Sequence, residues 1–329
     1  MESRVKVTYL LGAGFSRAIT DDKAPLTKEL GERLKGTFPD DLRQKFNFDP
    51  NNIELFFTQL DLEIFHLRQL KQDTNVLEKI REEASCKILS IFATKELFCT
   101  ENERIKISDS ANEICKILFR KNDTILTVNY DCALENILVM QNKWSTLGGW
   151  GRGFCFNNEG AENRDKKLNI EIFKLHGSIN FVLVAPLNGN EFDYNNLHLK
   201  WRVDRELFPN CHEPPTSWEE AIKEYVILPS YLKQFENTKI VNLWKEAVLR
   251  IQDSGRLVII GCALREEDYL LRFLISLTSQ TAKIIIIDPS ADEIKSRVIK
   301  TISVNANNIH PIKSEIQNID DDIVDMIYA

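Results

Sequence analysis

Two short runs near the carboxyl end of the chain constrain its fold most strongly. Arg256–Ile260 (RLVII) and Lys283–Ile287 (KIIII) are almost continuously apolar. Strands of this kind are buried on both faces, as in a parallel sheet covered by helices. The helical pattern between them, from Glu266 to Leu277, supplies the crossover that parallel neighbours need. These features predict an α/β fold with a doubly wound, Rossmann-like parallel sheet.

Strand signals also occur in the first half of the chain. Val5–Leu11, Thr124–Val128 and Ile170–Leu175 are apolar and rich in β-branched or aromatic residues. From Ile53 to about Phe98 the spacing of apolar residues is helical, with no strand signal. We therefore expect one catalytic domain over residues 1–329, with an all-helical lobe inserted at about 50–120.

Weaker signals complete the expected order of elements. Pro25–Leu34, Ile107–Phe119, Cys132–Gln141 and Asn237–Ile251 are predicted helices, and Asp320–Asp322 starts another. Short strands are expected at Tyr225–Leu228 and His310–Ile312. Residues 147–167 and 185–217 are rich in glycine, asparagine, proline or polar residues, which predicts loops.

Three segments directly follow predicted strands and carry the candidate chemistry. They are Gly12-Ala13-Gly14-Phe15-Ser16, Asn129-Tyr130-Asp131 and His176-Gly177-Ser178. In an open α/β sheet, ligands bind at the carboxyl ends of the strands. We expect the three segments to meet at that edge.

The Gly12/Gly14 pair has two interpretations. A G-x-G turn after a first strand places backbone N–H groups against a pyrophosphate, whereas a tight strand-to-helix turn needs glycine without any ligand. Ser16 is available to cap the segment that follows. Arg17 stands where a dehydrogenase fingerprint has its third glycine, and no second strand ends in an acid about 20 residues later. A hydride-transferring dehydrogenase is therefore disfavoured, and the chain contains no P-loop pattern.

Asn129 and Asp131 also allow a structural and a functional interpretation. Polar residues at a strand exit can cap the next helix, as Asp131 would for a helix starting at Cys132. Alternatively, Asn129 orients ribose hydroxyls or a water molecule, while Asp131 accepts a hydrogen bond from a hydroxyl.

His176 is the histidine with the most distinctive setting. It ends an apolar strand and precedes a glycine, so a ligand has room to approach the backbone. Imidazole exchanges protons near neutral pH, which suits a general base, although a lone histidine is more often structural. The other histidines, His66, His198, His212 and His310, lie in helical or polar contexts.

Charge and cysteine usage exclude several classes of protein. The formal net charge is −7 and no Lys/Arg-rich run occurs, so direct nucleic-acid binding is not expected. The seven cysteines include no C-x-x-C pair, which argues against a zinc ribbon and fits a reducing compartment. No stretch of about 18 apolar residues is present, so we expect a cytoplasmic protein that does not cross a membrane.

The three segments, followed by Ile260-Gly261-Cys262-Ala263-Leu264 and Ile287-Asp288, resemble the sirtuin superfamily in order and spacing. Three features of deacetylase sirtuins are absent, and the first two are the zinc-binding cysteine pairs and a G-[IV]-P-D-F-R segment. The F-G-E segment for acyl-lysine is also missing, and residues 226–231 (VILPSY) occupy that region. In these departures the chain resembles the sirtuin-like branch of bacterial anti-phage systems, whose members hydrolyse NAD.

This resemblance implies a role for each matching residue. Gly12, Ala13, Gly14 and Ser16 would hold the pyrophosphate of NAD, with Gly261 against the adenine half and Asp288 at the adenosine ribose. Phe15 and Cys262 would be further cofactor-binding residues. Asn129 and Asp131 would face the nicotinamide ribose, and His176 would be the general base. NAD would be the substrate, and no metal is expected. Asp268 matches a pattern of this branch without an assigned role.

The predicted function is therefore cleavage of the nicotinamide N-glycosidic bond, giving nicotinamide and linear or cyclised ADP-ribose. A protein deacylase that consumes NAD and a non-catalytic NAD or ADP-ribose sensor are the alternatives. The resemblance also implies a homo-oligomer, or a separately encoded defence partner that is helicase-like or Argonaute-like.

Overall fold

The computed structural model describes residues 5–94, 107–144, 170–184, 197–199, 222–230, 238–265, 268–301 and 305–329. Six strands form one sheet in the order β3-β2-β1-β7-β8-β9, and every neighbouring pair is parallel. The strands are β1 (Val7–Leu11), β2 (Thr124–Thr127), β3 (Glu171–Lys174), β7 (Arg256–Ile260), β8 (Lys283–Ile287) and β9 (Ile309–Ile312). The predicted Rossmann-like sheet is confirmed.

The order of the strands reverses beside β1. From β1 the chain proceeds to β2 and β3 on one side, and β7, β8 and β9 follow on the other. All residues of β1, β2 and β7 are buried, as expected for strands covered on both faces. The edge beside β1 and β7 is therefore a topological switch point, where α/β sheets bind ligands.

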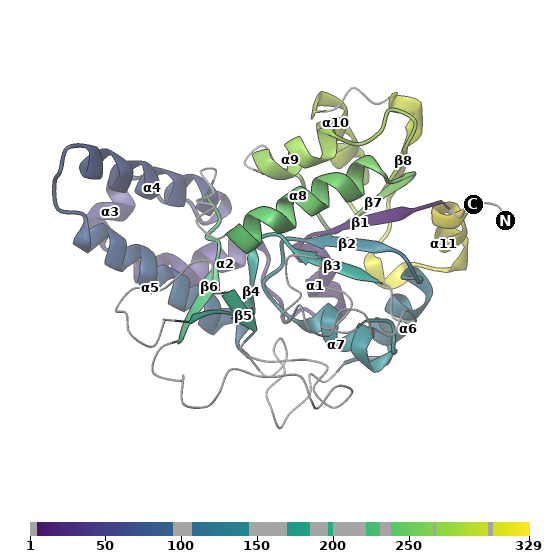
Figure 1. Cartoon of the computed structure of the whole chain (residues 1–329), viewed down its shortest axis with the longest axis horizontal. Coiled ribbons are helices and arrows are strands. Elements are labelled where there is room, and N and C mark those ends of the chain that lie inside the picture. Colours follow the sequence, from purple (N-terminus) through teal and green to yellow (C-terminus); the bar gives the residue numbers. More distant parts are fainter. Residues whose placement is uncertain are drawn as a thin grey trace.

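Helices cover both faces of this sheet (Figure 1). One layer contains α1 (Ala13–Ile19), α6 (Asp109–Leu118) and α7 (Ala133–Met140), and the other contains α8 (Thr238–Gln252), α9 (Tyr269–Ser276) and α10 (Ala291–Thr301). The last helix, α11 (Asp321–Tyr328), lies beside α6 and begins with Asp320, whose Oδ1 accepts from Ile323 N at 3.0 Å. The predicted helices at 107–119, 132–141 and 237–251 are confirmed as α6, α7 and α8.

A helical lobe projects from the sheet between β1 and β2 (Figure 1). It contains α2 (Thr27–Leu34), α3 (Asp40–Lys45), α4 (Ile53–Gln69) and α5 (Asn75–Phe92). Phenylalanine rings form much of its core, with Phe38 and Phe56 centroids 4.4 Å apart. The lobe starts before the predicted limit of about 50, because α2 packs closely on the turn that precedes α4. The contact is so close that a Cβ on Gly31 would lie 2.4 Å from Pro50 O. It ends before 120, since α6 packs on the sheet helices instead.

A second, antiparallel sheet follows β3. Its strands β4 (Gly177–Val184), β5 (Leu197–Leu199) and β6 (Ile222–Val226) lie in the order β5-β4-β6. Gly177 has φ +79°, a left-handed conformation that lets the chain turn away immediately after His176. Of this sheet the sequence predicted a strand only near β6. The predicted loop at 147–167 and most of that at 185–217 lie outside the described residues.

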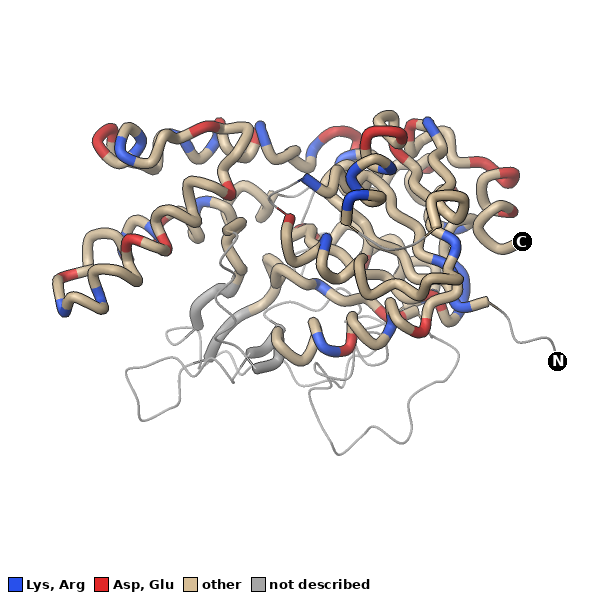
Figure 2. Tube along the Cα trace, turned by 90° about the horizontal axis from the view of Figure 1, so that it is seen from above, with Lys and Arg blue, Asp and Glu red and all other residues tan. Residues whose placement is uncertain are grey.

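Lys and Arg residues are interspersed with Asp and Glu residues along the described helices (Figure 2). In the lobe, for example, Lys45 pairs with Glu63 and Arg68 with Glu78. Within the described residues, none of the helices has the length and apolar character needed to cross a membrane.

Candidate functional site

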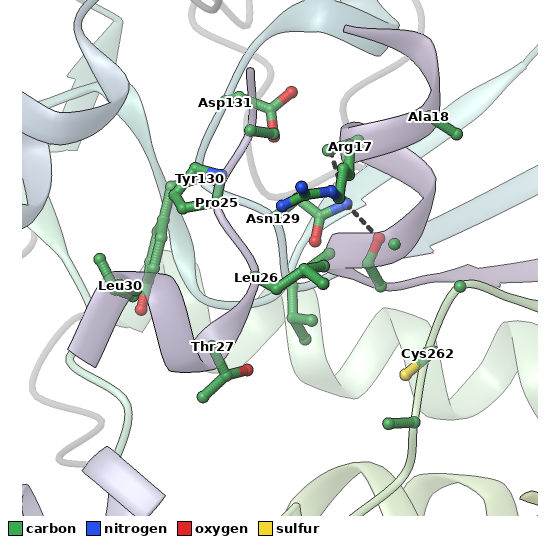
Figure 3. A pocket seen from close by; sticks show the side chains of 18 of the residues that line it. Arg17, Ala18, Pro25, Leu26, Thr27, Leu30, Asn129, Tyr130, Asp131 and Cys262 are labelled. Carbon is green, nitrogen blue, oxygen red and sulfur yellow. Dashed lines mark hydrogen bonds between the residues drawn. The ribbon is translucent and has the colours of Figure 1, made fainter. Parts of the chain in front are cut away.

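A cavity of about 490 Å³ lies at the carboxyl edge of the parallel sheet. Its wall includes the segments that follow β1, β2, β3, β7 and β8, together with parts of α2, α4 and α5 from the lobe. Figure 3 labels lining residues from the segments after β1, β2 and β7 and from α2. The size is within the range of small-molecule sites, and the location is the switch point. Every predicted site residue except Phe15 lines this cavity, so the structure brings the three segments together as expected.

Gly12, Gly14 and Gly261 interlock beneath the cavity. Gly14 N donates to Gly261 O at 2.9 Å, and Gly261 adopts φ +57°. A Cβ on Gly12 would lie 2.5 Å from Gly261 O, and one on Gly261 would lie 2.3 Å from Phe15 N. Close packing of two turns therefore accounts for these glycines without any ligand.

The turn after β1 differs from the prediction in two details. Gly12 is the N-cap of α1, so Ser16 lies within the helix and does not cap it. The reason is that α1 begins directly at Ala13. Phe15 is 1% exposed and packs edge-on against Phe119 in the core, with ring centroids 5.9 Å apart.

Asn129 joins the exit of β2 to the turn after β1. Its Nδ2 donates to Gly12 O and to Ser16 Oγ, both at 2.8 Å (Figure 3). Its backbone N donates to Thr127 Oγ1 at 3.1 Å, and Thr127 Oγ1 donates to Leu11 O. Because both amide hydrogens of Asn129 are used, its Oδ1 is the atom it offers to a ligand or water.

The predicted capping role of Asp131 is met only in part, because Cys132 is the N-cap of α7 and Asp131 precedes it. The Oδ1 of Asp131 accepts from Ala133 N at 3.1 Å at the start of α7. Asp131 is only 2% exposed, yet its buried Oδ2 has no hydrogen-bond partner among the described residues. A buried carboxylate oxygen without a donor is energetically costly, so this atom calls for a hydrogen bond from a ligand or water.

A buried ion pair lies behind Asp131. Lys174 Nζ is 3.0 Å from Glu135 Oε1, and it also donates to the backbone O of Asp131. Burial raises the pKa of the Glu135 carboxyl. Burial by itself lowers the pKa of Lys174, but attraction to Glu135 outweighs it, so the pKa is raised and Lys174 stays protonated.

His176 lies between two aromatic side chains. Its ring centroid is 6.5 Å from that of Tyr130 and 6.4 Å from that of Trp244. Trp244 Nε1 donates to Leu175 O at 2.9 Å, and Tyr130 OH donates to Ile227 O at 2.6 Å, so both neighbours are themselves fixed. Burial raises the pKa of Tyr130, which keeps its hydroxyl protonated. The imidazole is 7% exposed at the cavity wall, a position suited to proton exchange.

Gly261, Cys262, Asp268 and Asp288 line the part of the cavity formed after β7 and β8. Burial raises the pKa of the Cys262 thiol to about 12, so it is neutral near pH 7. Asp288 Oδ1 accepts from Ser290 N at 2.8 Å, which leaves Oδ2 for other partners. Among the described residues, no group of three or more His, Cys, Asp or Glu side chains is arranged to hold a metal ion.

Several charged residues of the cavity were not predicted. Arg17 Nη1 lies 2.7 Å from Glu29 Oε1, and its Nε lies 2.9 Å from Asp22 Oδ1. Arg265 Nη1 donates to Asn51 O at 2.7 Å and so connects the segment after β7 to the lobe. Glu54 enters the wall from α4. The contacts of Arg17 with Glu29 and of Arg265 with Asn51 depend on packing of the lobe, so no local sequence pattern marks them.

No family model matches the chain, and no curated protein matches it. By structure it is similar to a Sir2 homologue mutant in complex with ADP-ribose: 11% identity, 98% of this chain and 91% of that chain covered, TM-score 0.45. A second similar structure is a Sir2 homologue–NAD complex, with 12% identity, 98% and 89% covered, and TM-score 0.37. At these values the similarity carries no argument about activity. The strand order and the cavity define the class, which is a Rossmann-like α/β protein with its site at the switch point.

Proposed function

We propose that the protein is an NAD⁺ glycohydrolase that releases nicotinamide and ADP-ribose. The observation that carries the proposal is the buried, unpartnered Oδ2 of Asp131, a residue that lines one cavity with Asn129 and His176. A carboxylate oxygen without a donor fits a ligand rich in hydroxyl groups, such as a ribose. The switch-point location fits a dinucleotide.

In this proposal each predicted residue has one task. Asp131 Oδ2 accepts from a hydroxyl of the nicotinamide ribose, and Asn129 Oδ1 orients the attacking water. Gly12, Ala13, Gly14 and Ser16 border the pyrophosphate, with Phe15 supporting the turn from the core. Gly261, Cys262 and Asp288 border the adenosine half, where Asp288 accepts from its ribose.

The reaction is a displacement at the anomeric carbon of the nicotinamide ribose. The C–N bond breaks and its electron pair leaves with nicotinamide, which becomes neutral. A water oxygen bonds to the carbon, and His176 takes the proton of that water. The developing oxocarbenium-like charge is stabilised by the carboxylate of Asp131, as carboxylates do in glycoside hydrolysis.

The experiment is incubation of the purified protein with NAD⁺, with nicotinamide and ADP-ribose measured over time. We expect turnover in the wild type and a loss of about 10²–10⁴-fold in His176→Ala, the range for removal of a general base. Turnover that survives both Asn129→Ala and His176→Ala would contradict the site assignment. Release of O-acetyl-ADP-ribose from an acetylated peptide would instead identify a deacylase, and tight NAD⁺ binding without turnover would identify a sensor.

The sequence resemblance supports a further proposal, namely that NAD⁺ depletion serves anti-phage defence in the cytoplasm. Such an activity must be silent before infection, which an oligomeric state or a helicase-like or Argonaute-like partner would provide. Cellular NAD⁺ measured during phage challenge tests this role. Depletion should occur in cells with the wild-type protein and not in cells with His176→Ala.

A further inference from the structure

The Lys174–Glu135 pair is one of the most deeply buried charge pairs among the described residues, with side chains 1% and 2% exposed. It lies where β3 and α7 meet, directly behind the candidate site. A buried ion pair is weak evidence of stabilisation, since well-packed apolar residues of similar size often replace one at no cost. The position of this pair therefore points to a role other than stability.

Both partners are tied to the segments that carry the site. Lys174 is two residues before His176, and its Nζ donates to the backbone O of Asp131. Glu135 lies in the first turn of α7, the helix whose Ala133 N is bound by Asp131 Oδ1. The lysine thus holds the backbone of Asp131, while the helix start holds one oxygen of its side chain.

These two restraints fix the direction of the remaining oxygen. The carbonyl O is bound by Lys174 and Oδ1 by Ala133 N, so Oδ2 is the one oxygen of Asp131 left buried without a partner among the described residues, on a residue that lines the cavity. A misplacement of about 1 Å at such a group can cost about 10²-fold in rate. Lys174 needs a buried counter-charge to remain there, and Glu135 supplies it at 3.0 Å.

We propose that Lys174 and Glu135 are positioning residues, which hold Asp131 so that its Oδ2 meets the ligand hydroxyl. Neither side chain touches the ligand in this arrangement. The proposal rests on the proposed function for its kinetic consequence, but the orientation of Asp131 is a property of the protein alone.

The test uses the double variant Lys174→Met/Glu135→Leu, which removes the pair without leaving one charge unpaired. We expect its melting temperature to stay within a few degrees of the wild type, because removing both buried charges offsets the hydrogen bond that Asp131 O loses. We expect kcat/KM for NAD⁺ to fall about 10- to 100-fold, and a crystal structure of the variant to show Asp131 Oδ2 turned from the cavity. A loss of activity that merely followed a loss of stability would be a structural effect and would overturn the proposal.

The matched control is the Arg81–Asp61 pair of the lobe, with N and O atoms 2.8 Å apart and the Asp61 side chain 1% exposed. Arg81→Met/Asp61→Leu removes an ion pair between α4 and α5 that is buried on the Asp61 side, with Arg81 31% exposed, and should leave kcat/KM unchanged. If the wild type cleaves NAD⁺ and the Lys174→Met/Glu135→Leu variant does so equally well, the positioning role is wrong. If the wild type does not cleave NAD⁺, the proposed function fails, and the crystal structure decides this proposal: an unmoved Asp131 overturns it.

Discussion

Two largely buried polar clusters of this protein differ in whether all of their polar atoms have hydrogen-bond partners within the protein. At the carboxyl edge of the sheet, Asn129, Asp131 and His176 surround a cavity, and Asp131 Oδ2 has no partner among the described residues. Near α11, Tyr9 OH lies 2.8 Å from Leu118 O and 2.9 Å from Tyr328 OH. We call the first set the open cluster and the second, with Asp123, the closed cluster.

Every hydroxyl of the closed cluster is used within the protein. Tyr328 OH donates to Asp123, and Arg120 lies 3.7 Å above the Tyr328 ring. A network whose members are all satisfied stabilises the fold. Buried oxygens without a partner in the described part of the chain also occur away from the cavity, for example Asp61 Oδ2 and Gln141 Oε1. The comparison teaches that neither burial nor an unsatisfied atom marks a site by itself, and that the open cluster is distinguished by having such an atom on a residue of a cavity wall.

The largest expected effect concerns Gly261, which lies beneath the open cluster. Gly261→Ala should lower the free energy of unfolding by about 3 kcal/mol or more, because φ is positive and the Cβ would lie 2.3 Å from Phe15 N. Chemical denaturation measures this change. The matched control is Gly36→Ala, since a Cβ there meets nothing within 4 Å; equal losses in both variants would contradict the interlock.

The second effect separates activity from stability. Asp131→Asn should reduce turnover of NAD⁺ about 10- to 100-fold, since a hydrogen bond to a charged group contributes about 1.5–3 kcal/mol. The melting temperature should change little, because Oδ1 of the amide can still accept from Ala133 N. Steady-state kinetics and a thermal scan measure the two quantities. A large loss of stability with unchanged turnover would show that Asp131 has a structural role, like the residues of the closed cluster.

The third effect is a loss of stability without a loss of activity, the reverse of what we expect at Asp131. Tyr328→Phe should lower the free energy of unfolding by about 1–3 kcal/mol, because Asp123 loses a buried donor while the ring volume is kept. Turnover should be unchanged. If Tyr328→Phe lost turnover while keeping wild-type stability, the distinction between the open and closed clusters would be wrong.

The closed cluster also predicts a pH dependence. Burial and the nearby Asp123 carboxylate raise the pKa of Tyr328, so the folded state keeps a proton that the unfolded state loses above about pH 10. This contribution to stability is fully present below that pH and decreases as pH rises through it. Unfolding measured from pH 8 to 11 should show a steeper decline for the wild type than for Tyr328→Phe.

The smallest effect is expected at Cys262. With a pKa of about 12, only about one thiol in 10⁴ is ionised at pH 8, and the thiolate is the reactive form. Iodoacetamide should therefore modify the exposed Cys86 and leave Cys262 intact, as mass spectrometry of the peptides would show. Rapid alkylation of Cys262 would mean that the cavity edge stabilises a thiolate.

The sequence predicted the parallel sheet because its strands are unambiguous. β7 and β8 are apolar throughout, and a buried parallel strand admits little else. The sequence also predicted the residues at the carboxyl edge, such as Asn129 and His176, because the end of a strand can be recognised from neighbouring residues alone. It did not predict β4 or β5, since their place depends on the left-handed Gly177 and on pairing with distant residues.

The contacts that support the site residues could not be predicted from the sequence either. Lys174 was visible only as a polar residue at the end of a strand, and its partner Glu135 as one acid of a helix. Their 3.0 Å contact arises from the packing of α7 on β3. Arg17 was noted for the glycine it replaces, while its ion pair with Glu29 depends on where the lobe folds back.

The interlock of Gly12 and Gly14 with Gly261 has a consequence for how the chain acquires its shape. Val7 is paired with Arg256 in the sheet, and most of the sequence lies between them. The turn after β1 therefore reaches its final form only after β7 has been synthesised and has docked. Contacts between such distant residues slow folding. The cavity floor is completed late in assembly. A nascent chain that has emerged only through β4 contains Asn129, Asp131 and His176 but lacks the Gly261 turn that completes the floor.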